Sequence, residues 1–416
     1  MIGSVLRLST LLLGVAFLLT GHGLQLAVIP LRAELAGWNS LYVGVLGSVY
    51  FCGFLFGCFT IPGLVSRIGH IRCFSTLTAL MTAAVLVLAL FNQFGVWLLL
   101  RFLCGVAISG LYLVIESWLN EKTENHVRGA VLATYTAIVL TALAGGQLLL
   151  NVAPLEGQHL FIISAVLIVM AAIPICVTST SQPAQIPGAT FSPLLVIQTS
   201  RAASLGAFVA GMVASVYYAL GPAYGLQVGM DVPLISLMMA LGIIGGALSL
   251  LPLGRLSDRM DRRVVIAWIM FAGALVSVAA VLLPVSAIPA VMFFFGAFVM
   301  PIQALCLAHA SDHIGNQSFL EVGTGLLVMN ALGAIVGPLA GAQAMQWFGS
   351  GAFFLFSGVV LTISGVAVVL MITSRKAATD YHSRFRPVTT AAAQGALQLD
   401  PRTLDDDQDG EAEASD

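Results

Sequence analysis

The sequence predicts an all-α polytopic membrane protein, with twelve transmembrane helices arranged as two pseudo-symmetric bundles of six. Composition is the first observation behind this prediction: hydrophobic residues make up 59% of the 416 residues, charged residues make up 9%, and the mean hydropathy is +0.99. Soluble proteins have roughly 45–50% apolar and about 25% charged residues. The other two observations are the number of long apolar runs and a polar loop that occurs twice.

Apolar runs of about 20 residues, the length that crosses a bilayer as a helix, occur twelve times. The first run follows a single basic residue and contains no small-residue cleavage site, so we interpret it as a retained span rather than a signal peptide. The expected spans are 7–30, 41–65, 73–92, 95–118, 129–152, 159–178, 201–225, 232–253, 263–284, 288–312, 319–347 and 351–373.

Six runs lie on each side of a segment rich in Pro, Ser and Thr, which predicts two domains joined by a linker. The tail after the last run ends in DDDQDGEAEASD and has few large apolar residues, so we expect it to be disordered. The expected division is 1–178 for the first bundle, 179–200 for a cytoplasmic linker, 201–373 for the second bundle and 374–416 for a cytoplasmic tail.

Basic residues indicate how the chain crosses the membrane. With a cytoplasmic N-terminus, 15 of the 17 Lys and Arg residues fall in cytoplasmic segments, whereas Arg32 falls outside and Arg101 within a span. Positive charges favour the cytoplasmic side of membrane proteins. We therefore expect both termini in the cytoplasm of a multi-pass protein of the bacterial cytoplasmic (inner) membrane.

A polar loop between the second and third runs of each half indicates that one bundle was duplicated. The second copy reads GRLSDRMDRR from Gly254 to Arg263, and its Arg259 lies 192 residues after Arg67 of the first copy. We expect Gly254 to form a tight turn, Asp258 to face the positive end of a helix, and the arginines to hold the turn in the cytoplasm.

This loop resembles the signature loop of the major facilitator superfamily, G-x-L-x-D-R-x-G-R-R. The second copy departs from it at Asp261, where the family usually has Gly; the first copy keeps Arg67 and Gly69 but has Pro62, Ser66 and His70 in place of Gly, Asp and Arg. Further segments resemble the YcaD-like branch of this superfamily, which implies a permease: Ile115–Asn120, Gly145–Leu149 and Leu307–His313.

Polar side chains are costly inside a bilayer, so those within spans are candidates for lining a solute cavity. Arg101 begins an Arg-x-x-x-Gly sequence that resembles a fourth-span motif of the superfamily, in which the arginine faces the central cavity; an arginine snorkelling to the outer interface is the alternative. Hydrogen bonding between helices is the alternative for the other candidates. These are His22, Gln25, Gln147, Tyr217, Tyr218, Gln303, His309 and Asn330.

Glu116 and Asp312 lie near the cytoplasmic ends of the fourth and tenth runs and are 196 residues apart. We expect them to occupy equivalent places in the two halves, with Glu116 paired to Arg67 and Asp312 paired to Arg259. Such ion pairs would form when the cytoplasmic side closes and rearrange when it opens. Static pairs that secure helix ends are the alternative.

Small residues in the eleventh run predict close helix packing. Gly333, Gly337 and Gly341 repeat at helical spacing, and Pro338 is expected to kink the helix.

The lack of several well-known motifs argues against other classes of function. The sequence has no nucleotide-binding, metalloprotease or serine-hydrolase motif and no basic stripe for nucleic acid, and its six cysteines lack metal-ligand spacing. We expect no enzymatic activity, cofactor or metal, but a monomeric secondary transporter of a small organic solute in the lipid bilayer. Proton coupling is a weaker hypothesis, with His22, His309, Glu116 and Asp312 as titratable candidates. A non-transporting sensor or scaffold of the same fold, acting through the acidic tail, is the alternative.

Overall fold

The computed structural model describes residues 9–123, 127–176, 193–313 and 319–374. Every regular element within these ranges is a helix, and twelve stretches are long and apolar enough to cross a membrane. They coincide with the twelve predicted runs, and their ends differ from the predicted ends by only a few residues.

The first half contains six spans, with short helical segments after the fifth and sixth. Its elements are α2 (Ser9–Leu35), α3 (Ser40–Ile68), α4 (His70–Leu90), α5 (Phe94–Lys122), α6 (Arg128–Leu148) with η2 (Leu149–Val152), and α7 (His159–Met170) with α8 (Ala172–Cys176).

The second half repeats this order, except that its fourth span is divided into two helices at Met300–Pro301. Its elements are α10 (Arg201–Gln227), α11 (Val232–Ser257), α12 (Arg262–Leu282), η3 (Val285–Ala287), α13 (Ile288–Val299), α14 (Ile302–Ser311), α15 (Phe319–Phe348) and α16 (Ala352–Ser374). Part of the predicted linker forms the helix α9 (Pro193–Thr199). This helix packs against α10 and α15. The rest of that linker to residue 192 and the predicted tail from 375 lie outside the described residues.

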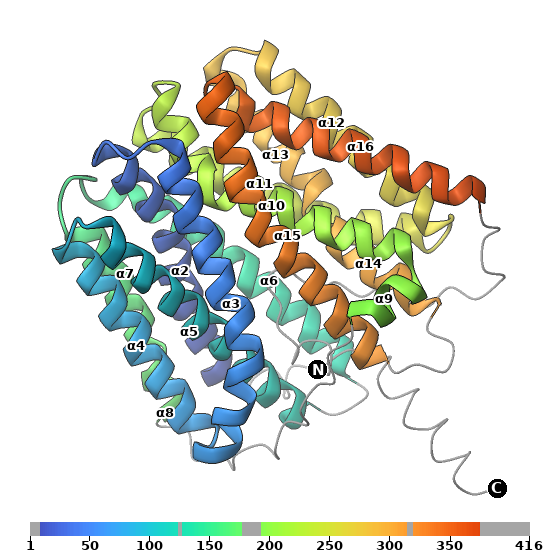
Figure 1. Cartoon of the computed structure of the whole chain (residues 1–416). Coiled ribbons are helices and arrows are strands. Elements are labelled where there is room, and N and C mark those ends of the chain that lie inside the picture. The colour runs from blue at the N-terminus through green and yellow to red at the C-terminus, as the bar shows by residue number, and fades with distance from the viewer. Residues whose placement is uncertain (1–8, 124–126, 177–192, 314–318, 375–416) are drawn as a thin grey trace, which may run out of the picture.

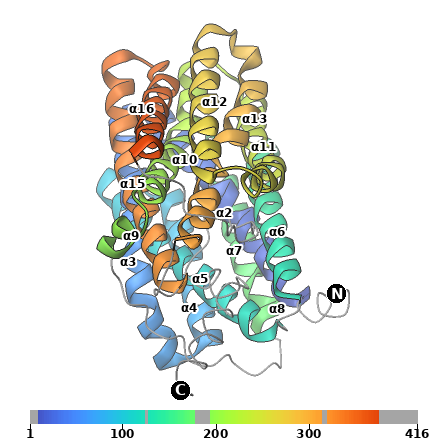
Figure 2. The same cartoon turned by 90° about the vertical axis from the view of Figure 1, so that its right-hand side faces the viewer.

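The two halves form separate bundles that are built alike (Figures 1 and 2). In the first half, a Cβ on Gly105 would overlap the carbonyl oxygen of Tyr50; in the second, a Cβ on Gly296 would overlap that of Gly242. Gly296 follows Gly105 by 191 residues and Gly242 follows Tyr50 by 192. The same backbone contact is therefore made twice, which supports duplication of one bundle.

The turns before the second span of each half are also repeated. Gly37 and Gly229 have φ values of 77° and 78°, which glycine adopts without steric cost. Two residues later Asn39 caps α3 and Asp231 caps α11, each accepting a hydrogen bond from the backbone N–H three residues on. Both spans therefore start at the same end of the molecule and run in the same direction.

The halves pack together at the end that carries Gly37 and Gly229, which we call the closed end. Gln227 of α10 donates hydrogen bonds to Glu34 at 3.1 Å and to Ser40 at 3.0 Å, both in the first half. Asn151 donates to Ser236 across the halves at 2.9 Å. The helices of the two bundles diverge from this end toward the opposite one (Figure 1), so the molecule is V-shaped.

Helices α3 and α15 of the two halves pack closely against each other near the closed end. Gly44 and Gly47 lie against Pro338, because a Cβ at either position would come too close to that proline. Proline removes a hydrogen bond from a helix interior and so leaves a carbonyl free near its position. Ser48 donates to the nearby carbonyl oxygen of Ile335 at 2.6 Å.

The opposite end, which we call the basic end, carries both copies of the polar loop. Gly69, with a φ of 83°, forms the turn between α3 and α4. Gly254 was expected to form the equivalent turn, and this expectation is wrong: Gly254 lies in the last turn of α11, and the chain reverses at Asp258–Asp261. A cap at Asp261, whose side chain accepts from the backbone N–H of Arg263, starts α12 without requiring glycine.

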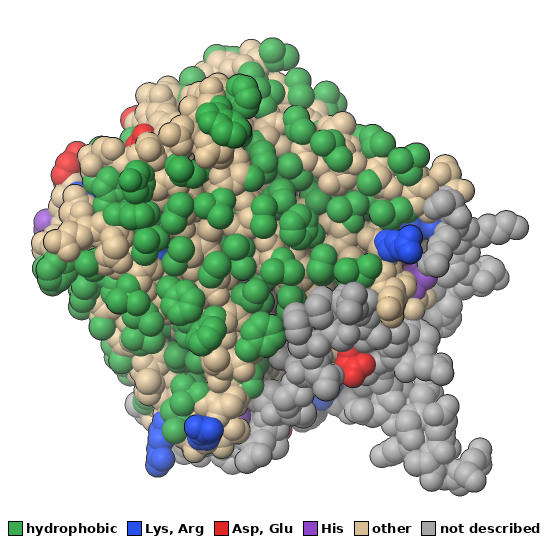
Figure 3. Space-filling model, in the orientation of Figure 1, with side chains coloured by type: hydrophobic (Ala, Val, Ile, Leu, Met, Phe, Trp, Pro, Cys, Tyr) green, Lys and Arg blue, Asp and Glu red, His purple; other side chains and the backbone are tan. Residues whose placement is uncertain are grey.

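The outer surface is apolar over the middle of both bundles (Figure 3). Leu275, Leu282 and Ile363 are exposed large hydrophobic side chains of the span helices. Such a surface is stable against lipid tails and not against water, as expected of a multi-pass membrane protein.

Two adjacent glycines of α6 test whether close backbone contact holds the bundle together. A Cβ on Gly146 would overlap the carbonyl oxygen of Thr20 in α2, whereas a Cβ on Gly145 would meet open space. We expect Gly146→Leu to destabilise the protein by about 3 kcal/mol through overpacking. Gly145→Leu should be neutral or stabilise the helix by roughly 1 kcal/mol, because leucine is the better helix former. Thermal unfolding of the two purified variants in detergent measures the difference; equal Tm values would contradict the packing.

Candidate functional site

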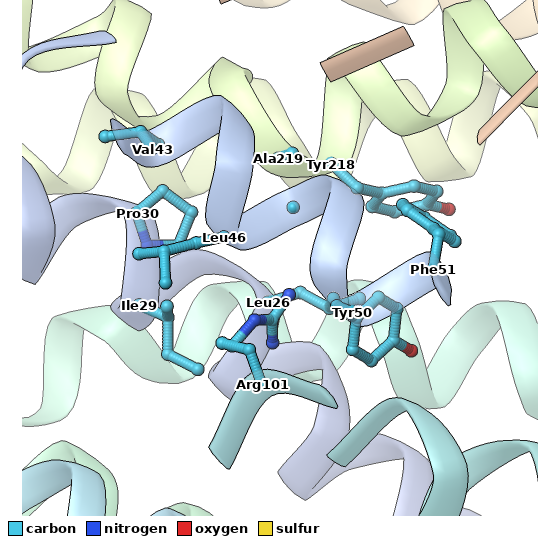
Figure 4. Close-up of a pocket in the computed structure, with 11 residues that line it drawn as sticks. Leu26, Ile29, Pro30, Val43, Leu46, Tyr50, Phe51, Arg101, Tyr218 and Ala219 are labelled. Atoms are coloured by element: carbon cyan, nitrogen blue, oxygen red, sulfur yellow. The ribbon is translucent and has the colours of Figure 1, made fainter. Parts of the chain in front are cut away.

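A cavity lies between the two halves, beside the closed end (Figure 4). The space is narrow and partly open to its surroundings. The first half contributes residues of α2, α3 and α5, and the second half contributes two residues of α10. Its lining residues are Leu26, Ile29, Pro30, Val43, Leu46, Gly47, Tyr50, Phe51, Arg101, Tyr218 and Ala219.

The cavity lies within the spans, in the part nearer the closed end. Val43 and Tyr50 follow the first residue of α3 by three and ten positions, which places them about 5 and 15 Å from that end of a 29-residue helix. A solute held here would be in contact with both halves.

Arg101 is the charged residue of this cavity lining. Its side chain rises from α5 toward α2 and α3, and its guanidinium carbon lies 4.3 Å from the centre of the Tyr50 ring (Figure 4). The residue is only 5% exposed, which argues against snorkelling to the interface. Its Nε and Nη1 atoms are buried and form no hydrogen bond with any described residue. Stacking on an aromatic ring stabilises a guanidinium but does not satisfy its N–H groups.

Behind Tyr50, a chain of polar contacts continues into the first bundle. The Tyr50 hydroxyl and His22 Nε2 are 3.1 Å apart, and His22 Nδ1 is 3.2 Å from Gln25 Oε1. Gln25 in turn donates to the sulfur of Cys104 at 3.2 Å, one helical turn beyond Arg101. The structure thus brings three predicted site residues, His22, Gln25 and Arg101, into one connected group.

Of the two adjacent tyrosines in α10, only Tyr218 lines this cavity. Its ring lies opposite Arg101 and packs edge-on against Tyr217, with ring centres 4.8 Å apart. Tyr217 instead donates a hydrogen bond to the backbone oxygen of Met239 in α11. It therefore holds two helices of the second half together.

Two amide side chains in other helices also bond across helices. Gln147 of α6 donates to the backbone oxygen of Gly23 at 3.0 Å. Asn330 of α15 donates to Gln303 of α14 at 3.3 Å and to the backbone oxygen of Ala207 at 3.3 Å. None of these residues lines the cavity described above.

The second-half copy of the polar loop is organised around Arg262. Its side chain is completely buried and forms ion pairs with Asp312 at 2.7 Å and with Asp258 at 3.1 Å. It thereby joins the end of α11, the start of α12 and the end of α14. The expected pairing of Asp312 with Arg259 is wrong, because Arg259 is exposed and lies three residues away from the buried position of Arg262.

Arg263 serves the same turn through a different partner. It donates to both carboxylate oxygens of Asp261, with a shortest distance of 2.8 Å. Partial burial raises the pKa of Asp261, but the hydrogen bonds and charge of Arg263 outweigh it, so that the pKa lies below the usual value. His309 lies near this corner rather than in the cavity lining, with its ring 4.6 Å from that of His313.

Glu116 has a different environment from Asp312. It is fully buried in α5 and accepts a hydrogen bond from Tyr135 of α6 at 3.2 Å, instead of the expected pairing with Arg67. The repeated glycine contacts relate α5 to the second half by 191 residues, so the counterpart of Asp312 is Glu121 and not Glu116. The expectation of equivalence, based on a separation of 196 residues, is therefore corrected.

The first-half copy of the loop lacks this buried ion-pair arrangement. Ser66 stands at the place of Asp258 and His70 at the place of Arg262, 192 residues apart in both cases. His70 is buried, stacks 6.2 Å from the Trp118 ring, and its Nε2 has no hydrogen-bond partner among the described residues.

The glycines of α15 lie against α10. A Cβ on Gly333 would overlap the carbonyl oxygen of Phe208, and one on Gly337 would overlap that of Met212. Gly341 faces Val216 and Leu220 of the same helix.

Sequence reasoning missed three residues of these sites. Tyr50 was overlooked because a tyrosine inside an apolar run is not unusual, and Cys104 because it behaves there as a small apolar side chain. Arg262 was counted among the basic residues but not selected. It lies four residues after Asp258, but across the turn between α11 and α12, so helical spacing gave no indication of the pairing.

Comparison with known proteins agrees with the fold. The chain is 26% identical over 366 residues to the uncharacterised MFS-type transporter YcaD of Salmonella newport (strain SL254), which covers 87% of this chain and 94% of that protein. YcaD of Salmonella arizonae is equally similar. Among solved structures, the nucleoside transporter NupG superposes with a TM-score of 0.74 at 10% identity, covering 88% of this chain and 99% of NupG.

A second solved structure has the same fold at low sequence identity. The bacterial homologue of the human lysosomal transporter Spinster, in an inward-facing and unoccupied conformation, has a TM-score of 0.64 at 15% identity, covering 96% of this chain and 98% of that one. The sequence profile of the Major Facilitator Superfamily matches residues 11–320 and 203–402. With twelve spans in two like bundles and a profile match over most of its length, this chain belongs to the Major Facilitator Superfamily and is a membrane transporter, not an enzyme.

Proposed function

We propose that this protein is a secondary transporter that moves a small organic solute across the bacterial cytoplasmic membrane by alternating access. One observation carries the proposal: a cavity within the spans lies between two bundles that pack together at one end and diverge at the other. Rocking of the bundles about this cavity would close the diverging end and open the packed one.

The contacts at the closed end suit such a motion. Gly44, Gly47 and Pro338 present smooth surfaces, and the polar contacts between halves there include the hydrogen bonds made by Gln227 and Asn151. Surfaces without interlocking side chains can separate without unpacking either core. The basic end would face the cytoplasm, as would both termini, since basic residues favour that side.

Energy for transport would come from a gradient, because no nucleotide-binding motif is present. We propose His22 as the group that couples transport to protons. Among the titratable candidates expected from the sequence, it is the one linked directly to the cavity wall, through the hydroxyl of Tyr50.

Distances between spin labels test alternating access without knowledge of the solute. Labels at His159 and Val285 report the closed end and labels at Arg67 and Arg259 report the basic end, in a background where Cys52, Cys58 and Cys176 are serine. We expect two distance populations in each pair, with the short distance at one end accompanying the long distance at the other as solutes or pH change their ratio. One unchanging population at both ends would refute the proposal.

The alternative function is a sensor or scaffold of the same fold, which would act through residues 375–416. Deleting this segment separates the two functions. A transporter truncated at residue 374 should still move its solute into liposomes, whereas a sensor should lose its output.

Removing the carboxylate of Asp312 tests the importance of the buried Arg262. We expect Asp312→Asn to destabilise the protein by about 3 kcal/mol, because it leaves a buried arginine with an incomplete set of partners. Arg259→Gln removes an exposed charge from the same turn and should change the stability by less than about 0.5 kcal/mol. Urea or thermal unfolding in detergent compares the two variants. A larger effect of Arg259→Gln would restore the pairing expected from the sequence.

A histidine substitution tests proton coupling. His22→Gln keeps a hydrogen-bonding side chain but cannot take up a proton. Solute flux should therefore lose its response to an imposed pH gradient, while downhill flux persists. His159→Gln, an exposed histidine at the closed end, should behave as the unmodified protein. Flux into proteoliposomes with and without a protonophore gives the measurement. A full pH response in His22→Gln would exclude this residue as the coupling group.

A further inference from the structure

We infer that the cavity binds a small organic monoanion, with a carboxylate facing Arg101 and an apolar or aromatic body against α3 and α10. The inference rests on the proposed transport function and names the class of solute for the same cavity.

The charge of Arg101 is the first argument. No described Asp or Glu forms an ion pair with Arg101, and two of its nitrogen atoms are buried without a hydrogen-bond partner. Buried arginines in proteins are normally paired with an acid and hydrogen-bonded. A ligand carboxylate would supply both the missing charge and the missing acceptors, in the planar two-pronged geometry that a guanidinium prefers.

The contrast with the other buried arginine strengthens this argument. Arg262 is also fully buried, but it has Asp312 and Asp258 as partners from its own half. The chain thus supplies an acid where an arginine has a structural role. At Arg101 no described residue supplies an acid, so the side facing the cavity is left for a bound partner.

The remaining walls define the rest of the ligand. Phe51 and Tyr218 lie side by side across the cavity from Arg101, and Leu26 and Leu46 line the space between (Figure 4). Apart from Arg101, the polar side chains of the lining are Tyr50 and Tyr218, and the Tyr50 hydroxyl already contacts His22. A sugar or a nucleoside would bring more hydroxyl groups than this wall can satisfy, whereas an aromatic or aliphatic carboxylate would leave none unsatisfied.

The composition of the lining agrees with a small organic ligand. One charged group at one wall and apolar contacts elsewhere are the usual composition of such sites.

Three probes of nearly equal shape and different charge test the inference: 4-phenylbutyrate, 4-phenylbutyramide and 4-phenylbutylamine. Binding to the purified full-length protein in detergent is measured by isothermal titration calorimetry and by thermal shift. We expect the carboxylate to bind at least about 10-fold more tightly than the amide, and the amine not to bind. Equal binding of the carboxylate and the amide, or an equal thermal shift with sodium chloride, would overturn the inference.

Variants of the arginine locate the binding. Arg101→Gln should weaken the binding of 4-phenylbutyrate at least about 10-fold, and Arg101→Lys should be intermediate, because it keeps the charge but not the planar fork. Arg201→Gln removes an exposed arginine at the start of α10 and should bind normally. Binding that survives in Arg101→Gln would overturn the assignment to this cavity.

The ligand-free Tm of Arg101→Gln guards against misfolding as the cause of lost binding. Because the variant removes a buried charge that has no acidic partner, its Tm should equal or exceed that of the unmodified protein. A lower Tm would mean that Arg101 has a structural partner, and this too would overturn the inference.

The outcomes separate the ligand class from the transport function. Protein that binds the carboxylate selectively but does not carry it into liposomes would refute the transport proposal alone. Protein that changes its label distances as a transporter should, but binds the three probes equally, would refute the monoanion alone.

Discussion

Close contact between helix backbones is the interaction on which this structure depends. Helices gain little from the hydrophobic effect within lipid, so they are held by packing and by hydrogen bonds between helices. Here glycines allow the carbonyl of one helix to touch the backbone of the next, at Gly105 and Gly146 in the first half and at Gly296 and Gly337 in the second. Hydrogen bonds of Gln147, Tyr217 and Asn330 between helices add to these contacts within each bundle.

Buried arginines show how differently such polar groups are used. Arg262 is neutralised by two aspartates and ties three helix ends of one half together, while Arg101 stands at the wall of a cavity between halves with an aromatic ring beneath it. The first arrangement stabilises a corner of the fold. The second leaves a buried charge without an acidic partner among the described residues, and the anion that we infer as ligand would supply that partner.

The twelve spans and their division into two halves were predictable from sequence, because apolar runs of membrane length and a loop repeated after 192 residues are strong signals. Among the site residues, Arg101, His22 and Gln25 were predictable as costly groups at membrane depth. The ion pairs were not. Choosing Arg262 over Arg259 requires knowing where α11 ends and α12 begins, and the equivalence of Asp312 to Glu121 depends on a one-residue shift that only the glycine contacts reveal. Tyr217 and Tyr218 differ by one position, and only helix rotation decides which of them faces the cavity.

The replacement of Arg262 by His70 at the equivalent corner of the first half gives the two bundles unequal rigidity. An arginine bonded to two acids ties three segments together, whereas an imidazole stacked on Trp118 makes only a weak contact. We therefore expect the α3–α4 corner of the first bundle to be less rigid than the α11–α12 corner of the second. Two bundles that are built alike thus differ in how firmly the corner between their second and third spans is held.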